Sequence, residues 1–580
     1  MKRDEIMQWK VKAEHWVTQL TDKDPMKKEL SELLLNEKVA EDCFYKDLEF
    51  GTGGMRGVMG PGTNRLNMYT VRKVALGLAQ YVVGQGQSAK ERGVVIAYDS
   101  RHLSKEFALE MAKVIGGQGV TAFLFDELRP TPLLSFAVRN LQAFAGVMIT
   151  ASHNPPEYNG LKVYGEDGAQ LPPEAADIII DSIAKLGIDL VQDPANEEQL
   201  ATEGLLVSIG KAVDLAYMEE LQTIRLNKEV TDVSIVFSAL HGTASKPMRQ
   251  AFETFGFEQV EYVKEQEQPD PNFSTVKSPN PEEAQAFELA IQYGERVGAD
   301  LLLATDPDAD RLGVVVRDEQ GQFNLLTGNQ IGTVILHYLL EEKVAAGELP
   351  RNGVVLKTIV STDIVTVMAE KYGLQTVDVL TGFKFIAEKI LTYKETQAQT
   401  FLFGFEESYG YLIGDFVRDK DAVQTAVFMA EIAAVYKDRG KTIYQVLQKV
   451  YEMYGFYKEL NTSITLEGKD GSEQITRIMN SFRHTPPLTV TGSRVQRIED
   501  YLSSEMLECS TGKITTIDLP TSNVLKYYLE NGAWFTIRPS GTEPKCKFYF
   551  AARGQTEKEA LDTVETICDS VLKRVQTDVL

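Results

Sequence analysis

Three aspartates stand at alternate positions, Asp306, Asp308 and Asp310, directly after the apolar run 301–305. Carboxylates this close repel one another unless a cation joins them, and carboxylate oxygens are ligands that Mg²⁺ prefers. An EF-hand is excluded because Arg311 occupies the sixth position, where that loop needs glycine. An exposed acidic turn is the alternative, but the position at a strand end favours a metal site.

A single serine, Ser152, follows another buried-strand pattern (145–149) within the segment 150–156. Two prolines prevent a helix from starting there, so the hydroxyl is displayed at a strand's carboxyl end, where ligands of open α/β sheets collect. Lys162 is a candidate general base or phosphate ligand. His153 is a weaker candidate, since a histidine bonded within its own loop is more common. For Ser152 itself, the alternative is a surface turn.

A cluster of cations and hydroxyls occurs near the carboxyl end of the chain, at Arg538, Ser540, Gly541, Thr542 and Lys545. Two positive side chains, two hydroxyls and a glycine that frees backbone N–H groups are what a phosphate dianion requires. A plain hairpin turn is the alternative, but such a turn does not need this combination. We therefore predict a phosphate-binding loop.

Glu406 and Ser408 lie one residue apart after a further strand pattern and suit the vicinal hydroxyls of a sugar. A helix-capping cluster is the alternative for this pair. Arg311, beside the aspartates, is available for a phosphate or for holding the loop. Lys420 is a further candidate cation, with a salt-bridged surface run as its alternative.

A glycine-rich loop spans 50–57 and includes Arg56. It is neither a Walker A loop nor a Rossmann fingerprint. Glycines let a backbone approach a ligand closely, and Arg56 would add positive charge. A structural turn explains the same residues equally well.

Composition places these loops in a soluble, multidomain protein. The chain has 580 residues with a formal charge of −23, which argues against nucleic acid and anionic membranes as partners. Four widely spaced cysteines give neither a disulfide framework nor a zinc site. The first residues lack a signal-peptide core and no run is long enough for a membrane span, so we expect a cytoplasmic protein.

The elements that must position these loops alternate between strands and helices, which predicts mostly parallel sheets. Three similar α/β units are expected, followed by a C-terminal α+β domain with an antiparallel sheet. The predicted boundaries are 1–205 (N-terminal extension and serine domain), 206–319 (aspartate domain), 320–445 (Glu406 domain) and 446–580 (C-terminal phosphate domain).

Four loops in this order resemble the α-D-phosphohexomutase family, and the resemblance covers nearly the whole chain. The segment 150–155 is similar to the family's phosphoserine loop and 306–311 to its metal loop. The segment 404–410 resembles the sugar loop, and 538–545 the phosphate loop. The resemblance implies four domains around a central cleft.

The length of the chain, the loop 50–57 and the residues Thr381, Gly382 and Lys384 resemble the longer bacterial members of this family. One position departs from part of the family. Some members carry a histidine two residues after the sugar-loop serine, and here that position is Gly410. No role of that histidine can therefore be transferred, and the sugar preference is less determined.

The resemblance implies that Ser152 carries a phosphoryl group and exchanges it between α-D-glucose 1-phosphate and glucose 6-phosphate. Glucose 1,6-bisphosphate is the implied intermediate and activator. One Mg²⁺ per chain is implied, held by Ser152 and the three aspartates. The implied partners are small hexose phosphates, and we expect a monomer or weak dimer.

Other functions remain open from the residues alone. Asp306 could be the nucleophile of a metal-dependent sugar-phosphate phosphatase, because an Asp-x-Asp pair after a strand suits aspartyl-phosphate chemistry. A non-catalytic sugar-phosphate sensor is an alternative from another functional class. Such a protein could lack the serine or an aspartate, but all of them are present here. Mannose or pentose phosphates are alternative substrates on the same scaffold.

Overall fold

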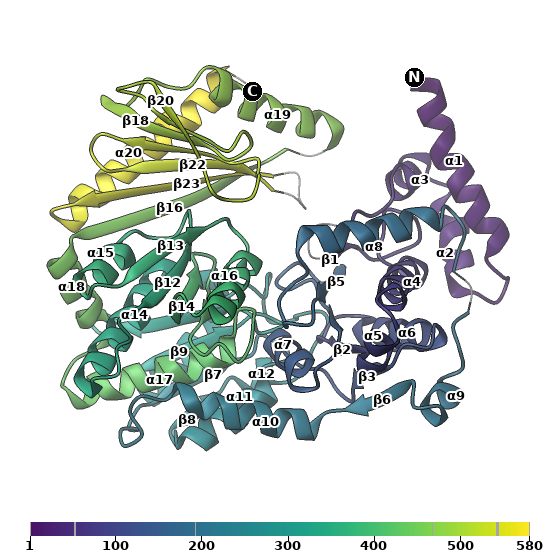
Figure 1. The fold of residues 1–580 in the computed structure, drawn as a ribbon, viewed down its shortest axis with the longest axis horizontal. Coiled ribbons are helices and arrows are strands. Elements are labelled where there is room, and N and C mark those ends of the chain that lie inside the picture. Colours follow the sequence, from purple (N-terminus) through teal and green to yellow (C-terminus); the bar gives the residue numbers. More distant parts are fainter. Residues whose placement is uncertain (1, 51–53, 192, 467, 541–544, 579–580) are drawn as a thin grey trace. The chain divides into compact units, whose positions relative to one another are not determined.

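The computed structural model describes residues 2–50, 54–191, 193–466, 468–540 and 545–578 (Figure 1). The chain forms two compact units: unit 1 comprises Met1–Leu326 and Ser408–Gly440, and unit 2 comprises Thr327–Glu407 and Lys441–Leu580. Three α/β sheets and one antiparallel C-terminal sheet confirm the predicted fold class. No helix among the described residues is both long and apolar enough to cross a membrane.

The first sheet of unit 1 has the strand order β1-β5-β4-β2-β3-β6. Its middle strands are parallel, whereas β5 is antiparallel to β4 and β1 is antiparallel to β5. The apolar strands β2 and β4 are completely buried because helices cover the sheet. The strands are β1 (Gly54–Val58), β2 (Val94–Tyr98), β3 (Ala122–Phe125), β4 (Ala145–Ile149), β5 (Tyr158–Tyr164) and β6 (Leu206–Ile209).

The helices of this part include an N-terminal extension that has its own small core around Trp16, Leu20 and Phe44. That core explains why a charged, helical sequence packs instead of remaining loose. The helices are α1 (Lys2–Gln19), α2 (Pro25–Leu33), α3 (Glu37–Phe44), α4 (Met68–Gly84), α5 (Gln87–Arg92), α6 (Ser104–Gly117), α7 (Thr131–Asn140), α8 (Pro173–Lys185) and α9 (Glu197–Thr202).

The predicted first boundary at residue 205 cuts this sheet. Strand β6 begins at Leu206 and pairs in parallel with β3, so it belongs to the first domain. It closes the edge that β3 would otherwise expose. Its four residues have no strong strand pattern, and only the pairing partner reveals the assignment.

The second sheet of unit 1 has the order β11-β10-β9-β7-β8, with β7 parallel to β8 and β9 and with β10 antiparallel to β9. A short 3-10 turn directly precedes helix α13. The elements are α10 (Lys211–Leu221), η1 (Gln222–Ile224), β7 (Ile235–Ser238), α11 (Ser245–Phe255), β8 (Val260–Tyr262), α12 (Lys264–Glu267), η2 (Ala284–Phe287), α13 (Glu288–Val297), β9 (Leu301–Thr305), β10 (Leu312–Arg317) and β11 (Phe323–Leu325).

Residues 408–440, which fall within the predicted third α/β unit (320–445), cluster by their contacts with unit 1. They contain β15 (Gly410–Leu412) and α17 (Ala422–Asp438). Helix α17 is buried on all sides from Ala422 to Tyr436 and contacts α11 and β9. A helix that is apolar all round needs neighbours on every face, and the second sheet supplies some of them.

In unit 2, β12 lies between β13 and β14 and is parallel to both. The C-terminal sheet has the order β16-β23-β22-β21-β18-β19-β20, with all pairs antiparallel. The elements are α14 (Gly328–Ala346), β12 (Gly353–Thr358), α15 (Ile364–Lys371), β13 (Gln375–Val379), α16 (Phe383–Thr396), β14 (Thr400–Glu406), α18 (Ile443–Tyr454), β16 (Phe456–Thr465), α19 (Gly468–His484), β17 (Thr489–Val490), β18 (Ser493–Asp500), β19 (Glu505–Glu508), β20 (Lys513–Thr516), β21 (Leu525–Leu529), β22 (Trp534–Pro539), β23 (Lys545–Gly554) and α20 (Glu557–Asp578).

The three α/β sheets share one connectivity around a central strand. In each sheet the first core strand (β2, β7 or β12) lies between the second and the third. The loop after the third core strand carries Ser152 in the first sheet, the aspartates in the second and Glu406 with Ser408 in the third. The strand–loop–helix rhythm of the sequence therefore corresponds to three equivalent loops.

Candidate functional site

Ser152 occupies the loop between β4 and β5 and is almost completely buried. Its Oγ donates a hydrogen bond of 2.6 Å to Asp306 Oδ2 and lies 3.2 Å from His153 Nδ1. The Ser152 amide donates to Thr150 Oγ1 at 2.8 Å. The predicted nucleophile and the predicted metal loop are therefore in direct contact.

The three aspartates form one buried cluster in which ligand oxygens lie within 4.8 Å of one another. Thr131 Oγ1 donates to Asp308 Oδ2 at 2.7 Å, and the amides of Asp310 and Arg311 donate to Asp306 Oδ1. Oδ1 of Asp308 and of Asp310 are buried without a hydrogen-bond partner in the described part of the chain. Buried carboxylate oxygens left without donors fit a hard divalent cation, so these residues suit Mg²⁺.

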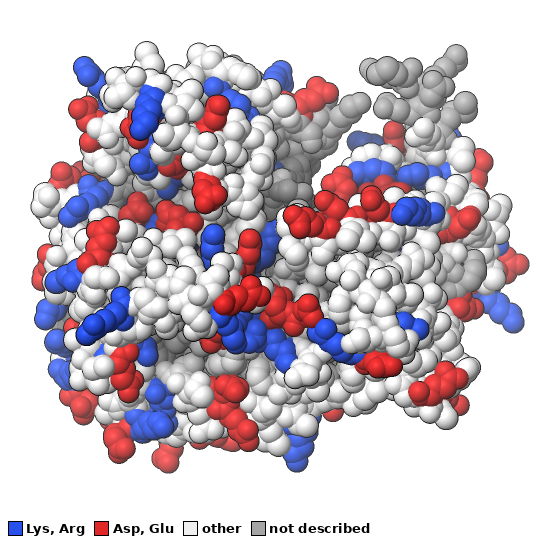
Figure 2. All heavy atoms as spheres, in the orientation of Figure 1, with Lys and Arg blue, Asp and Glu red and all other residues white. Residues whose placement is uncertain are grey.

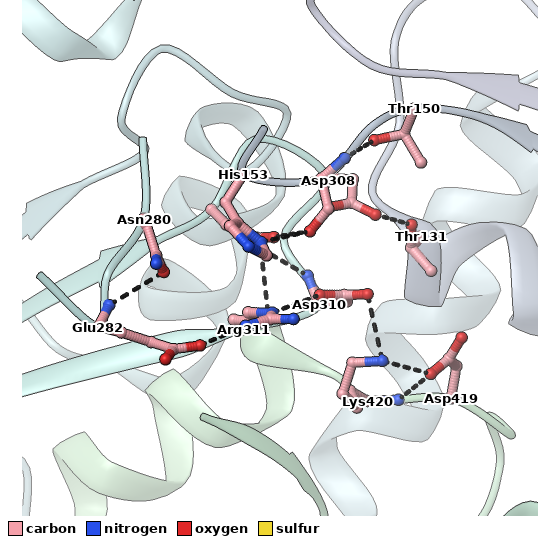
Figure 3. A network of polar contacts seen from close by, with 12 residues as sticks. Thr131, Thr150, His153, Asn280, Glu282, Asp308, Asp310, Arg311, Asp419 and Lys420 are labelled. Atoms are coloured by element: carbon pink, nitrogen blue, oxygen red, sulfur yellow. Dashed lines mark hydrogen bonds and ion pairs between the residues drawn. The ribbon is translucent and has the colours of Figure 1, made fainter. Parts of the chain in front are cut away.

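Two lysines approach the same cluster from different loops. Lys162 Nζ donates to Asp308 Oδ2 at 2.6 Å and to Asp310 Oδ2 at 2.7 Å. Lys420 Nζ lies 3.3 Å from Asp310 Oδ2 and 3.1 Å from Asp419 Oδ1 (Figure 3). The surface-run alternative for Lys420 is thereby excluded, since its side chain is only 9% exposed.

The charged groups of this cluster shift one another's pKa values strongly. Burial disfavours the ammonium of Lys162, but the carboxylates of Asp308 and Asp310 outweigh it and raise the lysine pKa. Burial and the two neighbouring carboxylates raise the pKa of Asp306 well above its ordinary value. The two lysines and Arg311 overcome burial and hold the pKa of Asp310 far below its usual range. Lys162 is thus a protonated cation here, whereas a general base would have to be neutral.

Arg101 is a residue that sequence analysis did not select. Its guanidinium donates to four backbone carbonyls of the serine loop, those of Ser152, Asn154, Pro155 and Tyr158. The signal was present, because the run 99–101 ends the strand next to β4. The carboxyl ends of adjacent parallel strands meet at one edge of a sheet.

Sequence analysis also did not predict several other contacts that hold these loops in place. The hydroxyl and amide of Thr243 both donate to the carbonyl of Pro307, which fixes the metal loop from β7. The Tyr164 hydroxyl donates to Asp419 Oδ2 at 2.8 Å and so holds the partner of Lys420. Arg56 Nη1 donates to Asn154 Oδ1 at 3.1 Å, which joins the glycine-rich loop to the serine loop.

Left-handed backbone conformations recur at these loops in residues other than glycine. Ser152 has φ 52°, Ala309 φ 52° and Tyr409 φ 63°, and Leu240 and His241 at the end of β7 are also left-handed. Such conformations cost free energy and persist where the surrounding structure imposes them. Their positions in three equivalent strand-end loops mark those loops as functional candidates.

Unit 1 therefore brings together Ser152, His153, Lys162, Asp306, Asp308, Asp310, Arg311 and Lys420. Arg311 also pairs with Glu282, so it stabilises the loop in addition to carrying charge. Ser408 is the first residue of the second segment of unit 1.

Unit 2 contains the other predicted binding residues. Glu406 accepts a hydrogen bond of 2.8 Å from the amide of Gly382, which brings two predicted sugar-binding loops together. Thr381 precedes Gly382, and Lys384 lies in the first turn of α16. Arg538 is the penultimate residue of β22, and the Ser540 amide donates to the carbonyl of Lys545 at 2.8 Å. Gly541 and Thr542 lie outside the described residues.

Models of four domains match the chain in order. They describe phosphoglucomutase/phosphomannomutase alpha/beta/alpha domain I (residues 47–187), domain II (215–321), domain III (327–454) and the C-terminal domain (489–569). The phosphoglucomutase of Staphylococcus aureus strain USA300 is 41% identical over 510 residues, which cover 88% of this chain and 90% of that protein.

Solved structures show the same fold at lower identity. A phosphoglucomutase/phosphomannomutase family protein of Burkholderia thailandensis superposes with a TM-score of 0.66 at 19% identity, covering 92% of this chain and 98% of the other. The open form of parafusin (phosphoglucomutase) from Paramecium gives a TM-score of 0.66 at 16% identity, covering 92% and 96%.

Proposed function

The chain belongs to the phosphoglucomutase/phosphomannomutase family, and we propose from this membership that it interconverts α-D-glucose 1-phosphate and glucose 6-phosphate. The observation that carries the proposal is the contact of Ser152 Oγ with Asp306 at 2.6 Å. It joins a candidate phosphoryl carrier to a carboxylate cluster that fits a divalent cation. The preference for glucose is supported by the phosphoglucomutases of Staphylococcus aureus, which are 41% identical to this chain.

The proposed reaction uses Ser152 as the phosphoryl carrier. The bond between phosphorus and Ser152 Oγ breaks, and a bond forms between phosphorus and a free hydroxyl of the sugar phosphate. A proton leaves that hydroxyl, and Ser152 Oγ gains one. The bound product is glucose 1,6-bisphosphate, and the reverse transfer of its other phosphoryl group regenerates phosphoserine.

Asp306, Asp308 and Asp310, together with the phosphorylated Ser152, would hold Mg²⁺. When bound, such an ion supplies positive charge next to the phosphoryl oxygens, which is the main electrostatic requirement of phosphoryl transfer. Thr131, Lys162 and the amides of the metal loop orient the carboxylates. These contacts fix the aspartates before any substrate arrives.

Proton transfer at Ser152 requires a group within hydrogen-bond reach. Asp306 Oδ2 at 2.6 Å and His153 Nδ1 at 3.2 Å satisfy this condition. Lys162 donates to Asp308 and Asp310 instead, so we assign it first to charge stabilisation of the transferred phosphoryl group. Its role as a general base stays a prediction.

We assign the loops of unit 2 to the parts of the substrate that do not react. Glu406, Thr381, Gly382 and Lys384 would bind sugar hydroxyls, and the Arg538–Lys545 loop the remaining phosphate. Ser408 is assigned to the sugar hydroxyls as well. The face drawn in Figure 2 shows acidic and basic side chains interspersed.

A coupled assay of the purified protein with Mg²⁺ and with glucose, mannose or ribose 1-phosphate tests the proposal. We expect the highest kcat/KM with glucose 1-phosphate. Release of inorganic phosphate without formation of glucose 6-phosphate would instead indicate a phosphatase. Binding of glucose 1-phosphate without turnover would indicate a sensor.

A further inference from the structure

Gly410 is the first residue of β15, two positions after Ser408. Its φ is not in the left-handed region, in contrast to that of the preceding Tyr409. The backbone at this position therefore accepts any L-residue. A reason for glycine must come from the space beside it.

That space is occupied by the side chain of Lys420. A Cβ atom on Gly410 would lie 2.1 Å from Lys420 Cδ and 2.7 Å from Lys420 Cγ. Both distances are far shorter than van der Waals contact. The two atoms belong to the middle of the lysine chain, so their displacement also moves the ammonium group at its end.

The backbone on either side cannot easily yield. The Leu312 amide donates to the carbonyl of Tyr409 at 3.0 Å, and the Ala422 amide donates to the carbonyl of Ala309 at 3.2 Å. These two bonds tie the segment 409–422 to the metal loop at both ends. Within the segment, the Asp421 amide donates to the backbone carbonyl of Tyr411 at 2.9 Å.

Asp421 fixes the position of Lys420 further. Its carboxylate caps α17 by accepting from the amides of Val423 and Gln424, and it also accepts from the Tyr217 hydroxyl at 2.8 Å. The residue next to Lys420 is thus held by these three hydrogen bonds to its carboxylate and by the bond that its own amide donates. A side chain at position 410 must consequently be accommodated by Lys420 itself.

We propose that Gly410 is a positioning residue, whose missing side chain opens the path by which Lys420 places its ammonium on Asp310 and Asp419. Any larger residue at 410 moves this cation away from the metal loop. The displacement of Lys420 by a side chain at position 410 follows from the distances between the two residues. Its consequence for turnover rests on the proposed function, to which it adds the positive charge of Lys420 beside the metal loop.

Competitive labelling of the full chain with acetic anhydride, read by mass spectrometry, tests the geometry without reference to activity. Lys420 is buried and ion-paired, so we expect slow acetylation in the native protein and severalfold faster acetylation in Gly410→Ala. Lys162 is the internal control and should keep its rate. An unchanged rate at Lys420 in a folded Gly410→Ala variant overturns the proposal.

Gly77→Ala is the matched control. Its new Cβ would lie 2.7 Å from Ile183 Cγ1, so it introduces similar crowding in α4, without any contact with Lys420. We expect a comparable loss of thermal stability and no change in the acetylation of Lys420. Equal acceleration at Lys420 in both variants would mean general loosening, and would also overturn the proposal.

A double-mutant cycle then tests the catalytic consequence. In the native background, Gly410→Ala should lower kcat/KM by about 10–100-fold, because a small misplacement of a charged group is costly. In Lys420→Ala the obstructing Cγ and Cδ atoms are absent, so Gly410→Ala should add less than about twofold. Equal losses in both backgrounds contradict the assignment. Absence of mutase activity in the native protein refutes the proposed function, whereas the labelling result still decides the role of Gly410.

Discussion

Ser152 Oγ donates a 2.6 Å hydrogen bond to Asp306 Oδ2, although the two residues are 154 positions apart in the chain. The bond joins the loop after β4 in the first sheet to the loop after β9 in the second sheet. It brings the hydroxyl of Ser152 into hydrogen-bond contact with the carboxylate cluster.

Removal of the hydroxyl should abolish phosphoryl transfer. For Ser152→Ala we expect mutase activity to fall by about 10³-fold or more, as for other lost nucleophiles, with the fold retained. Intact mass should show one phosphoryl group on the native protein after incubation with glucose 1,6-bisphosphate, and none on the variant. Ser182→Ala, on the surface of α8, serves as the control. Activity above a few per cent in Ser152→Ala would exclude this serine from the mechanism.

The aspartate cluster should make activity depend on a divalent cation. Treatment with a chelator is expected to abolish turnover, and added Mg²⁺ should restore it, because Oδ1 of Asp308 and Oδ1 of Asp310 have no hydrogen-bond donor among the described residues. Titration calorimetry should show weaker Mg²⁺ binding by Asp308→Asn than by the native chain. Asp181→Asn, an exposed position in α8, should bind normally. Full activity after exhaustive chelation would contradict the metal assignment.

Arg101 should act by positioning the serine loop. Arg101→Lys retains the charge but cannot donate to four carbonyls at once, so we expect kcat to fall by about 10–100-fold. The free energy of unfolding should also decrease, by about 2–3 kcal/mol, because buried carbonyls lose their donors. Urea denaturation and steady-state kinetics measure the two effects. Arg92→Lys, at a more exposed arginine that also donates to carbonyls, should change neither strongly.

Glu459 on β16 should make the stability of unit 2 depend on pH. Burial, opposed by hydrogen bonds from Thr362 and Asn329, raises the pKa of this carboxyl to about 7. The folded chain therefore retains a proton that the unfolded chain releases above its ordinary pKa of 4.5. The free energy of unfolding must then fall as pH rises from about 4.5 to 7, by at most about 3 kcal/mol.

Glu459→Gln should remove that pH dependence because an amide does not titrate. Denaturant titrations at several pH values within this window measure the effect. Glu505→Gln, at an exposed position of the same sheet, is the control and should leave the slope unchanged. If the native protein and Glu459→Gln show parallel profiles, Glu459 is not the titrating group.

Sequence patterns were sufficient to predict where the aspartate loop and the serine loop lie in the chain. Alternate aspartates after an apolar strand, and a serine followed by two prolines after another, are local features that need no partner to be recognised. The strands 145–149 and 301–305 were predicted correctly because fully buried parallel strands give continuous apolar runs.

The supporting residues were decided only by tertiary structure. Thr131 and Thr243 carry no chemical signal of their own, and the strand-end position of Arg101 did not reveal its partners. These residues matter because distant carbonyls and carboxylates lie within their reach. The assignment of 408–440 to unit 1 likewise depends on packing, since an all-apolar helix does not specify which neighbours will cover it.

The amino-acid sequence alone thus determined which groups are candidates for the chemistry, because residue type and strand-end position are encoded locally. The tertiary structure decided which of these groups meet, how they shift one another's pKa values and how close Lys420 lies to Gly410. Those properties depend on distances between segments that are remote in the chain. Burial then amplifies each charge interaction at such distances.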